Sequence, residues 1–269
     1  MTTVSATNSP DGTPITILIT GKVATVCLNN PASRNALSMQ VMIDLEKTFT
    51  DLGNRGDVSV IILEAAGPVF SSGHNLKEVM SDNRKQVMSD LFNQCSQMMQ
   101  VIVNLPKPVI AKVNGIATAA GCQLVASCDL AFATESSRFA TPGVNLGLFC
   151  STPMVALSRN VSPKHAMEML LSGEFINAEH AAHIGLLNRT AATEEELDTL
   201  VDDFARRIAS KSPLTLKIGK TAFYKQLPLS LADAYAYTSE VMAENMQTLD
   251  AKEGISAFLE KRSPDWQGK

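Results

Sequence analysis

Cysteine is scarce in this sequence, and its placement excludes two common uses of the residue. The five cysteines among 269 residues are Cys27, Cys95, Cys122, Cys128 and Cys150, and no two of them stand at C-x-x-C spacing. An odd number of scattered thiols is not the pattern of a disulfide framework or of a zinc site. We therefore expect neither disulfides nor a bound metal.

Long apolar runs and clusters of basic residues are also missing. Runs such as Val60–Leu63 and Pro108–Ala111 are far shorter than the roughly 20 residues that a membrane helix needs. The 23 Lys and Arg residues are dispersed along the chain and are outnumbered by 27 Asp and Glu residues. A nucleic-acid-binding surface requires clustered positive charge instead. Neither a membrane nor a nucleic acid is an expected partner.

The N-terminal residues carry no recognisable targeting signal. Residues 1–12 have neither the apolar centre of a signal peptide nor the arginines of a transit peptide. We expect them to form a short disordered tail on a cytoplasmic protein. A processed organellar protein, shown without its leader, stays open as the alternative.

The rest of the chain alternates between strand-like and helical patterns, which predicts an α/β fold. One helix is especially clear, because Val87, Leu91, Cys95, Met98 and Ile102 form a single apolar stripe that ends before a proline. The β-branched runs that predict strands are Ile15–Thr20, Val23–Leu28, Val58–Ala65, Val109–Val113 and Leu130–Thr134.

The last third of the chain is almost wholly helical in pattern. It contains the predicted helices Glu194–Ala209, Pro213–Lys225, Leu229–Gln247 and Ala251–Lys261. The chain thus divides into an α/β core, residues 13–193, and a helical segment, residues 194–269. Periodicity alone favours packing within the chain for the apolar residues of this segment, including Met242 and Met246, with subunit contact as the alternative.

Two segments combine small residues with positions where a backbone can approach a ligand closely. Phe70–Glu78 follows one strand, and Asn114–Gln123 follows another. If a helix begins near Ala120, the free amides of its first turn favour an anionic oxygen. Two such amides from two turns, aimed at one point, would form an oxyanion hole. The alternative is a pair of ordinary tight turns.

Four motifs in order resemble the crotonase (enoyl-CoA hydratase/isomerase) superfamily. The family patterns are N-x-P-x-x-x-N-A-L, F-S-x-G-x-D-[LI]-K-E, P-V-I-A-x-[VI]-N-G with a later C-D, and F-x-x-K-R-x-P. They are matched by Asn29–Leu37, by Phe70–Glu78 with Asn75 in place of Asp, by Pro108–Gly115 with Cys128-Asp129, and by Phe258–Pro264. The resemblance runs from about Ile15 to Trp266.

The resemblance implies a fold, an assembly and a class of ligand. The fold is an α/β crotonase (ClpP/crotonase-like) spiral of ββα units, followed by a C-terminal helical trimerisation region. The assembly is a homotrimer or a dimer of trimers. The ligand is an acyl-CoA thioester, whose enolate an oxyanion hole stabilises, and coenzyme A enters only as part of the substrate, with no other cofactor.

The resemblance also assigns roles to individual residues. It implies that the backbone amides of His74 and Ala120 form the oxyanion hole. Phosphate contacts would come from Lys77, Arg34 and Lys261 of the partner subunit. The full set implied to line the coenzyme A and acyl path is Ser33, Arg34, His74, Asn75, Leu76, Lys77, Ala120, Ser151, Phe258 and Lys261.

Both acid/base positions of the family's hydratases differ in this sequence. Hydratases carry two glutamates, and the corresponding positions hold Gln123 and Gly143. An amide cannot cycle a proton at neutral pH and glycine has no side chain, so two roles worth roughly 10²- to 10⁴-fold each are vacant. Ser151 stands where dienoyl isomerases and some dehalogenases of the family carry an acid. Hydratase activity is therefore doubtful.

Three other functions remain to be weighed. Methylmalonyl-CoA decarboxylase resembles this chain in having a histidine at the position of His74 and V-N-L-G at Val144–Gly147, and decarboxylation needs an oxyanion hole but no base. A non-catalytic acyl-CoA-binding or regulatory protein would also keep the residues that bind the acyl-CoA. A serine hydrolase using Ser71 or Ser72 ranks last, because neither lies in a G-x-S-x-G context.

The remaining reactive residue types have ordinary interpretations. Cys150 would need an activating base to act as a nucleophile, so packing is the expected role. His165, His180 and His183 fall on helical stretches, and the last two have i,i+3 spacing. The sequence offers this pair no third ligand, so no metal site is expected there.

Overall fold

The computed structural model describes residues 14–82 and 84–269, and the predicted tail over residues 1–12 lies outside them. A six-stranded sheet forms the centre, in the order β1-β2-β3-β5-β7-β10. Its first strands β1 (Ile15–Thr20) and β2 (Val23–Leu28) are antiparallel, and the next pairings are parallel. The other strands are β3 (Val60–Ala65), β5 (Val109–Val113), β7 (Leu130–Thr134) and β10 (Arg189–Ala191).

A second sheet consists of short strands, three of which come directly after long strands of the first sheet in the sequence. It has the order β4-β6-β8-β9, with β4 (Val69–Ser71), β6 (Ile116–Thr118), β8 (Arg138–Ala140) and β9 (Ile176–Asn177). The long strands β3, β5 and β7 are each followed by a short strand of this sheet and then by a helical stretch. The predicted spiral of ββα units is therefore confirmed.

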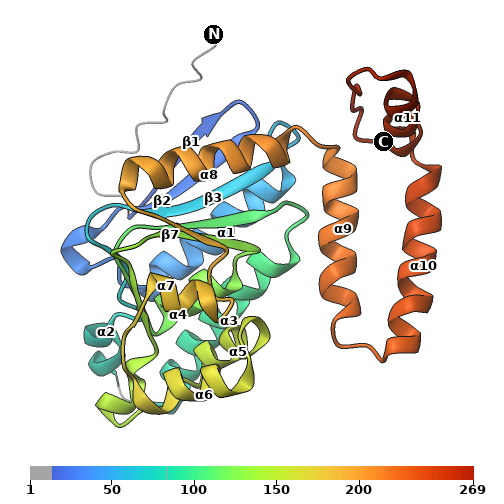
Figure 1. Ribbon diagram of the computed structural model, residues 1–269. Coiled ribbons are helices and arrows are strands. Elements are labelled where there is room, and N and C mark those ends of the chain that lie inside the picture. Colours follow the sequence, from blue (N-terminus) through green and yellow to red (C-terminus); the bar gives the residue numbers. More distant parts are fainter. Residues whose placement is uncertain (1–13, 83) are drawn as a thin grey trace.

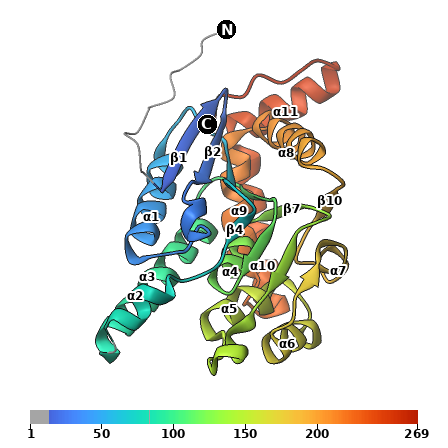
Figure 2. The ribbon, with the colours of Figure 1, turned by 90° about the vertical axis from the view of Figure 1, so that its left-hand side faces the viewer.

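Helices cover both faces of the six-stranded sheet (Figures 1 and 2). Because successive side chains of a strand point to opposite faces, Val60 and Ile62 of β3 pack against α8 (Glu194–Ala209), while Ile61 and Leu63 belong to the other core. That core includes the apolar sides of α1 (Met39–Asn54) and α3 (Lys85–Asn104). The stripe predicted for α3 is buried from Leu91 to Ile102.

The remaining helices of this body lie around the second sheet. They are α2 (Leu76–Ser81), α4 (Ala120–Ser127), α5 (Ser151–Asn160), α6 (Pro163–Ser172) and α7 (Ala178–His183), with the 3₁₀ helices η1 (Pro31–Ser33) and η2 (Pro142–Leu146). Every residue of α4 is buried. The helix therefore lies in the protein interior, and the surrounding core fixes the position of its N-terminus.

The C-terminal helices stand beside this body. Figure 1 shows α9 (Pro213–Gln226) and α10 (Leu231–Gln247) as a hairpin, with α11 (Leu249–Glu260) at its end. Packing of the methionines within the chain, which periodicity favoured, is wrong: Met242 is 60% exposed and Met246 is 43% exposed. The periodicity identified an apolar face, and nothing in the described chain covers it. None of the described helices is both long and apolar enough to cross a membrane.

A buried ion pair fastens α9 to the central sheet. The ammonium group of Lys220 donates to Asp129 Oδ2 at 2.7 Å and to two backbone carbonyls, those of Ile102 and Lys107. Asp129 also accepts from the amide of Val109 at 2.7 Å and from the Tyr224 hydroxyl at 2.9 Å. The acid of the C-D motif is thus fully engaged in holding the helix in place.

Candidate active site

Two turns meet at one edge of the second sheet. Strands β4 and β6 are parallel neighbours, with Ser71 opposite Ala117, so the turns that follow them leave from the same edge. Gly73, in one turn, has φ +86°, and a Cβ there would lie 3.0 Å from the Ala119 Cβ and 3.1 Å from the Ala120 nitrogen. Glycine at this position allows the two turns to touch.

The amides of His74 and Ala120 are free in this arrangement. His74 forms an isolated parallel bridge with Leu37, in which Leu37 donates to the Gly73 carbonyl at 2.8 Å and Asn75 donates to the Leu37 carbonyl at 3.1 Å. Since successive amides of an extended chain point to opposite sides, the N–H of His74 faces away from Leu37. Ala120 opens α4, where an N–H has no acceptor inside the helix. Neither N–H donates to a backbone carbonyl within residues 14–82 and 84–269.

The backbone before α4 is in an unusual conformation. Ala119 has φ 51° and ψ −119°, a region that residues with a side chain rarely occupy. Two residues later, a Cβ on Gly121 would lie 2.3 Å from the Ser71 carbonyl oxygen, so α4 can approach β4 this closely only with glycine there. Backbone strain of this kind concentrates at functional sites. The small residues of the Asn114–Gln123 segment therefore serve close backbone contact.

Two buried polar residues, whose role local sequence patterns do not reveal, hold the first turn. Asn35 donates to the carbonyls of Ala66 and Val69 at 2.9 and 2.7 Å. The Ser71 hydroxyl donates to the Asn35 carbonyl at 2.9 Å and accepts from the Gly73 amide at 3.2 Å. Ser71 is fully buried and occupied in this way, which counts against its use as a hydrolase nucleophile.

The residues expected along the coenzyme A path come together next to this turn. Asn75 caps α2 by accepting from the Lys77 amide at 3.2 Å, a role that an asparagine fills as well as the family's aspartate. The Ser72 amide donates to the Arg34 carbonyl at 3.1 Å, which places Ser33 and Arg34 beside the loop. Arg34, Leu76 and Lys77 are exposed. The region can therefore receive a ligand along its surface.

The His74 side chain is largely buried and uncharged. Its ring meets Phe92 of α3 edge-on, with ring centres 5.2 Å apart. Burial lowers the pKa of His74 to about 4, so the imidazole is neutral at pH 7. Its Nε2 has no hydrogen-bond partner among the described residues. A buried polar atom left unpaired is costly, and a bound ligand is one way to satisfy it.

The two positions assigned to the hydratase glutamates contain no acid/base group. Gln123 is buried in α4, and its Oε1 accepts from the Cys95 thiol at 3.9 Å. Gly143 lies in η2, where its amide donates to the Cys150 sulfur at 3.3 Å. A Cβ on Gly143 would be 2.8 Å from that sulfur. The Cys150 side chain thus occupies the space into which a side chain at 143 would extend.

Cys150 and Ser151 offer no activated nucleophile. Burial raises the pKa of the Cys150 thiol, an effect only partly opposed by the amide of Gly143, so the reactive thiolate is disfavoured. Ser151 is exposed at the start of α5, and its hydroxyl donates to the Phe149 carbonyl at 3.3 Å. The structure gives both residues local structural contacts.

Phe258 and Lys261 are not brought to the site within one chain. Phe258 is 82% exposed near the end of α11, and Lys261 follows that helix. Figure 1 shows α11 apart from α2 and α4. Any contribution from these residues to the same ligand therefore has to come from another copy of the chain.

The chain is similar to proteins of one family over most of its length. The enoyl-CoA hydratase/isomerase family model matches residues 19–269. A human enoyl-CoA hydratase domain-containing protein 3, named as mitochondrial, is 50% identical over 91% of this chain and 80% of its own length. A short-chain-enoyl-CoA hydratase of Clostridium acetobutylicum is 32% identical over 90% of this chain and 93% of its own length.

Solved structures agree with the sequence relatives. The crystal structure of human enoyl coenzyme A hydratase domain-containing protein 3 has a TM-score of 0.92 at 48% identity, covering 94% of this chain and 100% of that one. An enoyl-CoA hydratase of Mycobacterium smegmatis also has a TM-score of 0.92, at 44% identity, over 95% of this chain and 99% of that one. The chain belongs to the enoyl-CoA hydratase/isomerase family of the crotonase superfamily.

Proposed function

We propose that this protein binds an acyl-CoA thioester and stabilises its enolate with the backbone amides of His74 and Ala120. The observation that carries the proposal is the contact between the two turns, in which Gly73 and the strained Ala119 leave both amides free. Amides fixed in advance need no reorganisation when negative charge develops on the thioester oxygen. The names of the relatives support coenzyme A thioesters as the ligand class.

The proposed chemistry does not depend on a glutamate at position 123 or 143. Hydration requires one group to take a proton from water and another to deliver one to the α-carbon. Gln123 and Gly143 supply neither. Hydration of enoyl-CoA is therefore expected to be negligible, and the reaction is one in which enolate stabilisation suffices.

Decarboxylation of a carboxyacyl-CoA is the second candidate, and the His74 side chain favours it. In this reaction the bond from the α-carbon to the carboxylate breaks, its electron pair forms the enolate, carbon dioxide leaves, and water supplies a proton to the α-carbon. The neutral His74 has a buried, unpaired Nε2. In the tautomer that carries its proton on Nε2, the ring can donate to a substrate carboxylate.

Mass spectrometry of acyl-CoA thioesters incubated with the protein tests these alternatives. The panel includes enoyl, saturated and carboxyacyl thioesters. Product from a carboxyacyl thioester, lost in His74→Phe while affinity for saturated acyl-CoA remains, would support decarboxylation. Binding without any product would support a non-catalytic acyl-CoA-binding or regulatory protein. Absence of binding to every thioester would overturn the proposal.

Assembly and location belong to the same proposal. The exposed apolar residues of α9, α10 and α11 support contact with further copies of the chain, and the family resemblance implies a homotrimer or a dimer of trimers. A cytoplasmic location remains our proposal for the chain, with the mitochondrial names of relatives supporting a processed organellar form instead. Imaging of the protein carrying a C-terminal fluorescent tag in its native cell distinguishes the two locations.

A further inference from the structure

Three of the four histidines of the chain lie together on two neighbouring helices. His165 comes from α6, and His180 and His183 come from α7. The rings of His165 and His180 are 5.8 Å apart, and those of His180 and His183 are 6.3 Å apart, centre to centre. The fold thus brings a further histidine, from a neighbouring helix, next to the His180/His183 pair.

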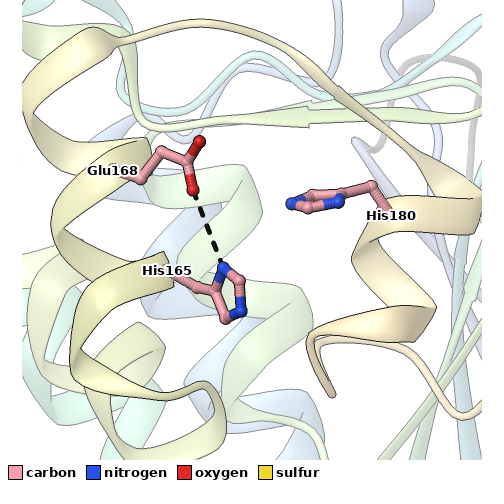
Figure 3. Close-up of side chains that lie close together, drawn as sticks. All are labelled: His165, Glu168 and His180. Atoms are coloured by element: carbon pink, nitrogen blue, oxygen red, sulfur yellow. Dashed lines mark ion pairs between the residues drawn. The ribbon is translucent and has the colours of Figure 1, made fainter.

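A carboxylate completes a set of three potential ligands. Glu168 lies one turn after His165 on α6, with its Oε2 3.6 Å from His165 Nδ1. One ligand atom from each of His165, Glu168 and His180 lies within 4.8 Å of the other two. Figure 3 shows the side chains of His165 and Glu168 projecting from α6 and the His180 ring projecting from α7 toward them.

We propose that His165, Glu168 and His180 bind a divalent transition metal, with Zn²⁺ as the best match. Two imidazoles and one carboxylate are a common zinc ligand set, with water as the fourth ligand. At bonds of about 2.0–2.2 Å, tetrahedral ligand atoms lie about 3.4 Å apart, so the set must contract. The His165 and Glu168 side chains are 36% and 65% exposed, which leaves them room to rotate inward.

The surroundings suit such a site. A hollow adjoins the cluster at His180 and is lined by Asn177, Glu179, His180, Ala182 and His183. Because the ligands come from α6 and α7, the bound metal joins the two helices. Binding to the folded state alone then stabilises the protein by mass action.

Calorimetric titration of the chelator-treated full-length protein with Zn²⁺ tests the proposal. We expect one equivalent per chain and a rise in melting temperature. His165→Ala and His180→Ala should each weaken binding by more than about tenfold, since even residues that only orient metal ligands are worth roughly 10- to 100-fold. Glu168→Gln should also weaken Zn²⁺ binding. All three side chains are at least partly exposed, so the metal-free variants should melt like the native protein.

Two matched controls define the site. Glu174→Gln removes an exposed carboxylate between α6 and α7, and His183→Ala removes the histidine that flanks the proposed ligands. Neither change should alter the Zn²⁺ affinity by more than about threefold, which is well below the effect of losing a metal ligand. Absence of zinc binding would overturn the proposal. So would a loss in His183→Ala as large as in His165→Ala, or equal binding of Mg²⁺, which prefers oxygen ligands.

Discussion

At the scale of single residues, Cys150 determines what can be placed at position 143. Its sulfur lies where a side chain on Gly143 would begin, and the Leu148 carbonyl oxygen lies almost as close, at 2.9 Å from the ideal Cβ. A glutamate introduced at 143 therefore needs both the Cys150 sulfur and the Leu148 backbone to give way. Restoring hydratase chemistry requires this neighbour to change as well as the two vacant positions.

The corresponding prediction concerns hydration of crotonyl-CoA, followed by the loss of enoyl absorbance. The native protein should show almost none. Gln123→Glu with Gly143→Glu should give a weak gain, and adding Cys150→Ala should raise it further, because it removes the closest of the atoms that crowd a Cβ at 143 and leaves the Leu148 backbone to adjust. The gain should exceed the sum of the single changes, since both carboxylates act on one water.

Cys150→Ala alone serves as the control for that series and should stay inactive. Vigorous hydration by the native protein that survives Gln123→Ala would contradict the assignment of these positions. It would mean that another group in the site transfers the protons.

The His74 imidazole should make folding stability depend on pH. Burial lowers its pKa from 6.5 to about 4, so between these values the unfolded chain binds more protons than the folded one. Stability is then lost as pH falls from 6.5 to 4, by about 3 kcal/mol from this group. Below pH 4 the effect of this group levels off.

Urea unfolding at several pH values measures this effect against His74→Phe, which keeps a ring beside Phe92 and the backbone amide. As pH falls from 6.5 to 4, the native protein should lose more free energy of unfolding than His74→Phe does. Parallel curves for the two proteins would contradict a buried, neutral His74.

The site residues show what the sequence can and cannot predict. The motifs placed the turns at His74 and Ala120, and the small residues between them indicated close backbone contact. The roles of Asn35 and Ser71, and the contact between Gly143 and Cys150, depend on the folded arrangement. Local sequence patterns do not specify such partners. The His165–Glu168–His180 cluster was missed for the same reason, because its histidines come from two helices.

At the scale of helices and strands, α9 depends on the Lys220–Asp129 pair. The Lys220 side chain is only 6% exposed and donates to three acceptors. Removing one partner of a buried ion pair leaves an uncompensated charge, at a cost of about 3–5 kcal/mol. Lys220→Met should therefore lower the free energy of unfolding by about that amount.

Chemical denaturation of Lys220→Met and Lys217→Met checks this prediction. Lys217 is an exposed lysine on the same helix, and its replacement should change stability by no more than about 0.5 kcal/mol. Equal effects of the two substitutions would contradict the anchoring role of Lys220.

The helices and strands were predicted well where local signals agree. Helix α8 has the predicted bounds because Thr193 caps its start and an apolar stripe spans it. Strand β3 begins at Val60, two residues later than the β-branched run predicts. The covering of α10 was mispredicted, since periodicity identifies an apolar face but does not identify its partner.

At the scale of the whole molecule, the C-terminal helices carry large apolar residues that the described part of the chain leaves uncovered. Large side chains on three consecutive helices are open to solvent in the single chain. The most exposed are Leu231, Tyr235, Met242, Phe258 and Leu259. Exposed apolar area of this kind marks a contact surface.

If these residues form the trimer contact that the family resemblance implies, light scattering combined with gel filtration should give three or six times the chain mass of 28.9 kDa. Tyr235→Glu with Leu231→Glu should reduce the assembled fraction, because it places charge in the contact. A monomer whose mass is independent of concentration would contradict this assembly and the coenzyme A contact from Lys261 of the partner subunit.

The measurement that tests the central claim most directly compares two ligands by calorimetry. One is butyryl-CoA, and the other is its thioether analogue, which lacks the carbonyl oxygen. If the amides of His74 and Ala120 bind that oxygen, the native protein prefers the thioester. Ala120→Pro, which removes one of the two donors, should markedly reduce the preference. Lys77→Ala should weaken both ligands equally, by up to about 1–2 kcal/mol for a partly desolvated phosphate contact. A preference that Ala120→Pro leaves unchanged would contradict the account.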